Sequence, residues 1–217
     1  NANAELLHQT AQGLAVGGIG RGFDLNTGMK TESIAVFGEG TYALTSTTHL
    51  TLGLRYTHDK RSYRGTQIPF NQPAGSVFAT VFNIPLLRDS ATFNKLTYRV
   101  AIRQDLTDMV NVYASYNRGF KSGIYSLNAA PGTNPVLKPQ TIDAFELGLK
   151  SQLFDNMLRL NLAGFHYKVK NYQVRSASPA LGAQAFLLNA AAVKVDGVEA
   201  EVEFVPTKGL RITGNAA

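Results

Sequence analysis

Residues 50–58 read Leu-Thr-Leu-Gly-Leu-Arg-Tyr-Thr-His, and this stretch decides the fold. Its apolar residues occupy every second position: Leu50, Leu52, Leu54 and Tyr56. The residues between them are small or polar: Thr51, Gly53, Arg55 and Thr57. A helix would scatter Arg55 among the leucines, whereas a strand separates the two sets because successive side chains point to opposite faces. The stretch therefore predicts a β-strand with one apolar and one polar face.

The same alternation recurs along the chain. In residues 95–103 the apolar set is Leu96, Tyr98, Val100 and Ile102, and the polar set is Lys95, Thr97, Arg99 and Arg103. Further strands of this kind are predicted at 32–44, 110–117, 144–153 and 198–204, and a last one opens at Leu210. The segment 186–205 is far longer than the ~5–6 residues usual in soluble sheets. The pattern predicts an all-β, antiparallel protein with about eight strands.

Two places break the alternation. Val193 and Val195 lie at odd positions, but the apolar residues resume at even positions from Val198. A bulge at Asp196-Gly197 would absorb the extra residue. A second irregularity is expected near Gly164.

The predicted connections alternate in length. Short ones rich in turn residues fall at 45–48, 105–108, 155–156 and 206–209, and long ones at about 60–93, 123–139 and 177–185. Short turns at one end and long loops at the other are typical of transmembrane barrels. Strands of about 11 residues, tilted by ~45°, would also match the ~25 Å apolar band of such a barrel. Four tyrosines near strand ends could form its aromatic girdles: Tyr42, Tyr56, Tyr98 and Tyr116.

A soluble sheet with one wet face is the competing interpretation. The chain has 217 residues, 17% of them charged, and no apolar run approaches the ~20 residues of a membrane helix. That absence does not argue against a barrel, whose strands alternate. Strand length, turn asymmetry and the tyrosines favour a membrane barrel over the soluble sheet.

Composition limits the other functional classes. No cysteine is present, so disulfides and thiolate metal sites are excluded. The net charge is +6, but the cations are spread along the chain, and the densest group is Arg55, Lys60, Arg61 and Arg64. This distribution does not indicate nucleic-acid binding. We expect no nucleic-acid partner.

Residues that could carry catalysis or bind a cofactor do not form a recognisable set. His8, His49, His58 and His166 stand without a partner at metal-ligand spacing. Gly17–Gly22 reads GGIGRG without a flanking helix and is interpreted as a flexible loop rather than a nucleotide site. We therefore predict no enzyme, no metal site and no cofactor.

Two sets of residues are candidates for function. Six would face a polar lumen, where opposite charges on neighbouring strands can balance them: Arg55, Arg99, Arg103, Tyr113, Glu199 and Glu201. Glu203 continues the same acidic row. In the longest predicted loop, arginine and aromatic residues, which are favoured anchors in binding surfaces, are candidate ligand contacts: Arg61, Tyr63, Arg64, Phe70, Phe78 and Phe82.

Four segments resemble the barrel region of TonB-dependent receptors, especially those similar to siderophore receptors. They are ESIAVFGEGTYALTSTTHLTLGLRYTHDKRSY (32–63), VYASYNRGFKSG (112–123), LKPQTIDAFELGLKSQLFDNMLRLNLAGFHY (137–167) and NAAAVKVDGVEAEVEF (189–204). They cover 91 of the 217 residues, in the family's order. Gln140 departs from the pattern, because the family usually has an acidic residue there.

The resemblance implies a 22-stranded barrel in the Gram-negative outer membrane, closed by a plug domain. It implies import of a scarce nutrient such as a ferric siderophore, energised by the TonB complex through the plug. Residues 1–217 would supply only an internal part of the barrel, without the plug. The predicted partners are outer-membrane lipid, the TonB complex and a small ligand.

Three other functions stay open at this point. Eight strands suffice to close a small barrel, so the chain could be a self-contained outer-membrane protein with a structural or adhesion role. An outer-membrane enzyme has no catalytic set to support it. A secreted soluble β-protein that binds carbohydrate or protein is the last alternative.

Overall fold

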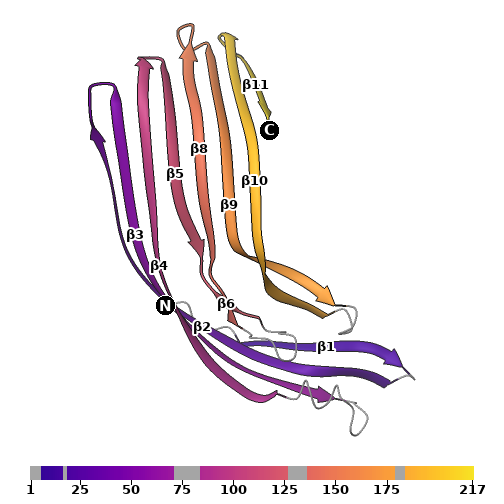
Figure 1. The fold of residues 1–217 in the computed structure, drawn as a ribbon. Coiled ribbons are helices and arrows are strands. Elements are labelled where there is room, and N and C mark those ends of the chain that lie inside the picture. Colours follow the sequence, from indigo (N-terminus) through magenta and orange to yellow (C-terminus); the bar gives the residue numbers. More distant parts are fainter. Residues whose placement is uncertain (1–5, 17–18, 71–83, 127–135, 179–183) are drawn as a thin grey trace.

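A computed structural model describes residues 6–16, 19–70, 84–126, 136–178 and 184–217. Nine antiparallel strands form one sheet, in the same order in space as in the chain (Figure 1). They are β1 (Leu6–Val16), β2 (Ile19–Ala43), β3 (Thr48–Phe70), β4 (Ile84–Thr107), β5 (Val110–Lys121), β8 (Gln140–Leu153), β9 (Leu158–Ser178), β10 (Gln184–Thr207) and β11 (Leu210–Ala216). The short strands β6 (Ile124–Tyr125) and β7 (Val136–Leu137) pair with each other in the β5–β8 connection.

The predicted strands and their faces are confirmed. All the alternating segments lie in strands of the large sheet, and every ladder is antiparallel. No helix occurs in the described ranges, and so none there could cross a membrane. The structure has one strand more than the predicted eight in its main sheet because residues 6–16 and 19–43 form an additional hairpin.

The predicted short turns lie together at one end of the sheet, at the top of Figure 1. They join β2 to β3, β4 to β5, β8 to β9 and β10 to β11. Asp155 and Asn156 have positive φ angles of 52° and 67°, and Gly209 has one of 88°. Asp, Asn and Gly tolerate this left-handed conformation best, which is why these residues can close such tight turns.

The long connections are shorter than predicted. Residues 60–70 continue β3 and residues 84–93 belong to β4, so most of the predicted 60–93 loop is paired strand. The alternation of apolar and polar residues is lost there because polar residues occupy both faces. Arg61 lies on the polar face, opposite Ala91, and Arg64 lies on the other face, opposite Arg88. The predicted flexible loop at Gly17–Gly22 is also wrong for Ile19–Gly22, which open β2; residues 17 and 18 lie outside the described residues.

Neither predicted irregularity in β9 and β10 occurs. Gly197 pairs with Phe165 and Val198 with Gly164 in an uninterrupted register, so the bulge at Asp196-Gly197 is wrong. Gly164 also pairs regularly with Leu147 on β8. On the polar face the Phe165 ring lies against Gly197, where any Cβ would collide with it. In this part of β9 and β10, apolar side chains therefore occupy positions on the polar face, and the backbone register is unchanged.

The sheet has one apolar and one polar face over the strand halves near the short turns. The apolar face carries large exposed side chains, among them Val36 at 70%, Leu147 at 66% and Val198 at 69% exposure. In contrast, the buried apolar side chains among the described residues are Tyr63, Tyr125, Leu137 and Val169, all of which lie far from the short turns. An apolar face with no protein layer over it is what a barrel wall presents to lipid, whereas a soluble sheet packs that face on a core.

Candidate functional site

The candidate site is the polar face of the sheet, defined by Arg55, Arg99, Arg103, Tyr113, Glu199 and Glu201. The ladder places all six on one face. Arg103 lies opposite Tyr113, and Tyr113 opposite Gly148. Glu199 and Glu201 lie opposite Ala163 and Asn161 on β9. The registers therefore place all six on one face of the sheet.

A hollow of about 710 Å³ lies on this face over β5, β8, β9, β10 and β11. The Tyr113 hydroxyl donates a 2.7 Å hydrogen bond to Glu146, and the Tyr167 hydroxyl donates one of 3.5 Å to the same carboxylate. The Lys150 ammonium lies 5.5 Å from the centre of the Tyr113 ring. The hollow is therefore polar, with both charges and an aromatic surface available to a solute.

Within the acidic row on β10, cations of the described neighbouring strands pair with Glu203 but not with Glu199 or Glu201. Glu203 pairs with Arg159 at 3.6 Å and with Arg211 at 3.4 Å. Glu201 accepts a 3.0 Å hydrogen bond from Asn161. Glu199 has no hydrogen bond or ion pair with the described residues, although it lines the hollow. These carboxylates are spread along one strand and do not converge on a reaction centre.

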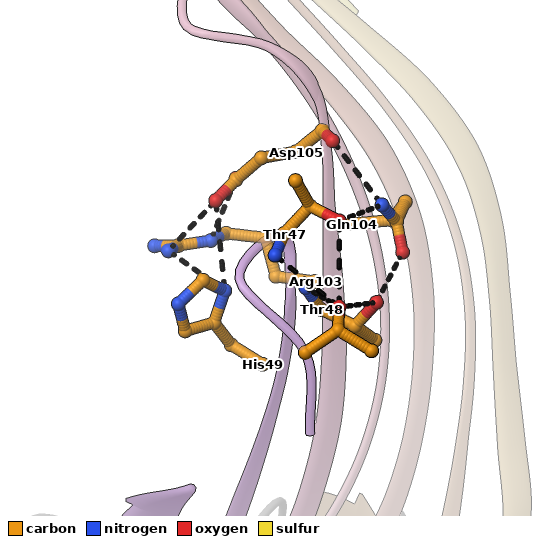
Figure 2. Close-up of polar contacts among 7 residues, drawn as sticks. Thr47, Thr48, His49, Arg103, Gln104 and Asp105 are labelled. Atoms are coloured by element: carbon orange, nitrogen blue, oxygen red, sulfur yellow. Dashed lines mark hydrogen bonds and ion pairs between the residues drawn. The ribbon is translucent and has the colours of Figure 1, made fainter. Parts of the chain in front are cut away.

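The arginines of the polar face serve different roles. Arg55 donates a 3.2 Å hydrogen bond to Thr57 and lies 5.3 Å from the centre of the Phe37 ring. Arg103 pairs with Asp105 at 3.0 Å and lies 3.2 Å from the His49 ring nitrogen (Figure 2). The Asp105 amide also donates a 2.8 Å hydrogen bond to the Thr47 carbonyl. Arg103 therefore belongs to a network that ties two adjacent turns together.

The second predicted set does not form one site. Arg61, Tyr63 and Arg64 lie on paired β3 rather than in a loop, and Phe70 ends that strand. Arg61 and Tyr63 are on the polar face, but Arg64 is on the opposite face, because successive strand residues alternate. Phe78 and Phe82 lie outside the described residues.

Tyr63 instead contacts a segment that the sequence did not reveal, the β5–β8 connection. Its ring stacks on Tyr125 of β6, with 5.2 Å between ring centres, and both side chains are buried. Burial raises the pKa of Tyr63, and burial together with the Asp89 carboxylate raises the pKa of Tyr125 to about 12. Gly123 lies against the Phe93 ring of β4, where a Cβ would clash.

The same connection is held on its other side by β9 and β10. Asn189 accepts a 2.8 Å hydrogen bond from the Lys138 amide and donates one of 3.1 Å to the Lys138 carbonyl. Gln173 donates to the carbonyls of Ser122 and Lys138 at 3.0 and 3.1 Å. The β6–β7 hairpin is thus folded over the polar face, from β3 and β4 to β9 and β10. We call residues 122–126 and 136–138 the inward hairpin.

Unsatisfied polar groups gather where the inward hairpin meets the sheet. Five buried side-chain atoms there have no hydrogen-bond partner among the described residues: Asp59 Oδ1, Arg61 Nε, Ser122 Oγ, Tyr125 Oη and Gln173 Oε1. Buried polar atoms are normally paired, and those that are not require water or a ligand as partner. The region therefore has free hydrogen-bonding capacity on the polar face. Among the described residues, no group of three His, Cys, Asp or Glu side chains could hold a metal ion.

A two-faced antiparallel sheet with short turns at one end and an uncovered apolar face is the wall of a transmembrane β-barrel. Residues 4–217 match the family model described as "TonB dependent receptor-like, beta-barrel". The chain belongs to this family.

Individual relatives agree with this assignment. The probable TonB-dependent receptor BfrD of Bordetella pertussis is 28% identical over 151 residues, which cover 68% of this chain and 19% of the relative. The ferric yersiniabactin uptake receptor FyuA from Yersinia pestis has a similar fold, with a TM-score of 0.72, 20% identity, and coverage of 89% of this chain and 28% of FyuA. The copper transporter OprC has a TM-score of 0.62 at 16% identity, over 90% of this chain and 34% of OprC. The chain spans about a fifth of the curated relative and about a third or less of the two structures.

Proposed function

We propose that the chain is part of an outer-membrane receptor that imports a scarce nutrient, such as a ferric siderophore, and is energised through TonB. The observation that carries the proposal is the family match over nearly the whole chain, on a sheet with one exposed apolar face and one polar face. Under this proposal the apolar face contacts the lipid of a Gram-negative outer membrane. The polar face, with Arg55, Arg99, Arg103, Tyr113, Glu199 and Glu201, lines the lumen.

The edges of the sheet support a larger barrel. In the described residues β1 and β11 are the two edge strands and do not pair with each other. Unpaired backbone groups at a strand edge are costly in lipid, so a spanning sheet must close. We infer that further strands complete the barrel and that a plug domain outside these residues provides the contact with TonB. The self-contained small barrel would require the β1–β11 pairing that this structure lacks.

The ligand contacts are proposed at the inward hairpin. Arg61 and Tyr63 lie there on the polar face, beside the unsatisfied Ser122 and Gln173. A ligand that brings its own oxygen atoms, as metal chelates do, would satisfy these groups. The named relatives and structures include a ferric yersiniabactin receptor and a copper transporter, so a chelated metal is the ligand class that we propose.

Uptake in cells tests the function. Iron-limited cells that express the complete protein should accumulate a labelled ferric siderophore from a panel, and cells without the gene should not. Loss of TonB, or collapse of the proton gradient, should abolish the uptake while leaving surface binding intact. Uptake that survives removal of TonB would contradict the proposal, as would the absence of transport for every iron and copper chelate in the panel.

A further inference from the structure

The apolar face carries a row of aromatic residues. Tyr98, Tyr116 and Phe145 lie on this face on adjacent strands β4, β5 and β8. The ring centres are 5.7 Å apart for Tyr98 and Tyr116, and 4.5 Å apart for Tyr116 and Phe145. Aromatic rows of this kind mark the interface between the hydrocarbon region and the headgroups.

A charged row on the same face follows at the end of the aromatic row, away from the short turns. The registers place Arg118 of β5 opposite Asp143 of β8, Asp143 opposite Lys168 of β9, and Lys168 opposite Lys194 of β10. Lys170 lies two positions further along β9. Four cations therefore stand within a few residues of the aromatic row.

The acidic groups nearby do not neutralise this row. Asp143 is shared: it accepts a 2.8 Å hydrogen bond from Tyr116 and lies 3.6 Å from Arg118 and 3.9 Å from Lys170. Asp196 is paired with His166. Lys168 and Lys194, directly opposite each other, have no hydrogen bond or ion pair with any described residue. Like charges in directly opposed positions destabilise a sheet, and Asp143, although it lies opposite Lys168, forms its ion pairs with Arg118 and Lys170 instead.

We propose that Lys168 and Lys194, with Lys170 beside them, bind the phosphate groups of an anionic lipid in the leaflet at the loop end of the barrel. The inference rests on the membrane placement in the proposed function, but not on nutrient import. At the end of the aromatic row, the lysines stand at the depth of the headgroups, and their side chains point outward from the barrel. The lipid phosphate supplies the counter-charge that the protein does not, and each such lysine contributes about 1 kcal/mol of attraction to an anionic surface.

Lipid titration of the complete protein tests the proposal. The protein is purified in a neutral maltoside detergent, and dioctanoyl phosphatidylglycerol or dioctanoyl phosphatidylcholine is added. Bound lipid is counted by native mass spectrometry. The parent should prefer phosphatidylglycerol, and K168Q/K194Q should bind it about 30-fold more weakly, from about 1 kcal/mol per lysine. K168R/K194R should keep the preference, because it keeps both charges.

The chain offers a matched control. Arg64 and Arg88 are also directly opposed on the same face, but further along the strands from the aromatic row. R64Q/R88Q removes the same charge and should leave lipid binding within about twofold of the parent. Equal losses in both double variants would overturn the proposal in favour of bulk electrostatics, as would a parent that does not distinguish the two lipids.

Thermal unfolding adds a measurement that separates binding from folding. In detergent without anionic lipid, K168Q/K194Q should unfold at the same temperature as the parent or a higher one, since the repulsion is gone. Phosphatidylglycerol should raise the unfolding temperature of the parent only. A variant that unfolds earlier in both conditions would show a structural role for the lysines and would contradict lipid binding. Uptake of the ferric siderophore is measured on the same variants. Absence of uptake would then contradict the transport proposal, whereas absence of lipid binding would contradict the lipid site, and the two failures can be told apart.

Discussion

Tyr113 on β5 lies directly opposite Gly148 on β8, and its ring occupies the space that a side chain at Gly148 would need. A Cβ at Gly148 would come within 2.5 Å of the ring. This arrangement holds the Tyr113 hydroxyl on Glu146, at 2.7 Å. Phe165 lies against Gly197 in the same way, so paired aromatic and glycine residues shape the polar face at two places.

The first prediction follows from this pair. Gly148→Ala should displace the Tyr113 ring, break its bond to Glu146, and lower the free energy of unfolding by about 1–3 kcal/mol, as overpacking does. Urea unfolding in detergent measures the loss. Gly38→Ala is the matched control, because it is also a strand glycine but has open space around its Cβ position. A Gly148→Ala protein as stable as Gly38→Ala would contradict the role of the glycine.

The second prediction concerns the two faces. A single cysteine at Val100 or Leu54 should react with a lipid-soluble maleimide in the reconstituted protein, because these side chains lie on the apolar face. Cysteine at Arg99 should react with a water-soluble reagent instead, since Arg99 is on the polar face. Both measurements use mass shifts of the labelled protein. Lipid-phase labelling of Arg99→Cys, with none at Val100→Cys, would reverse the proposed inside and outside.

The third prediction concerns the inward hairpin. Tyr125→Ala removes a buried ring and should release residues 122–126 and 136–138 from β3, so their amides should exchange hydrogen faster while the strands stay protected. The change should cost about 3–5 kcal/mol, the range for large aromatic deletions. Tyr42→Ala, an exposed aromatic change on β2, is the control. If Tyr42→Ala produced the same faster exchange in the hairpin, the stacking on Tyr63 would not be what holds it.

The fourth prediction is a pH dependence of the same contact. The pKa of Tyr125 is raised to about 12, and that of Tyr63 is raised as well. An unfolded tyrosine ionises near pH 10, so the stacked pair contributes its full stability below pH 10 and loses it as the pH rises through about 12. Hydrogen exchange in the hairpin should therefore accelerate over this range. Ionisation of Tyr125 near pH 10, followed through its phenolate absorbance against a Tyr125→Phe protein, would show that the side chain is not buried.

The strands near the short turns were predictable, because their signal is local. Leu52 is apolar because it lies on the apolar face, and Arg55 is charged because it lies on the polar face. Adjacent residues in the chain therefore alternate in polarity, and this alternation is visible in the sequence. The signal disappears beyond residue 60 of β3, where Arg61 and Arg64 show that both faces are polar. Backbone pairing continues there without any sequence pattern to reveal it. The prediction that Arg61, Tyr63 and Arg64 lie in a loop was wrong for that reason.

Other features depended on contacts between distant residues. The alternation change at Gly197 indicated a bulge, but the register is uninterrupted there, and the Phe165 ring of the neighbouring strand packs against Gly197. The inward hairpin rests on Tyr63, Gln173 and Asn189, which are remote from it in the chain. No sequence pattern within residues 122–138 indicates that the hairpin contacts Tyr63, Gln173 and Asn189.

The sequence by itself therefore determined the strands, their two faces and the short turns, because the surroundings of a strand select residues with a period of two. Only the tertiary structure decided how far the strands extend, where the aromatic rings lie and which face the β5–β8 connection covers. The physical reason is that those features come from packing and hydrogen bonds between segments far apart in the chain, whose partners are chosen by register and not by neighbouring residues.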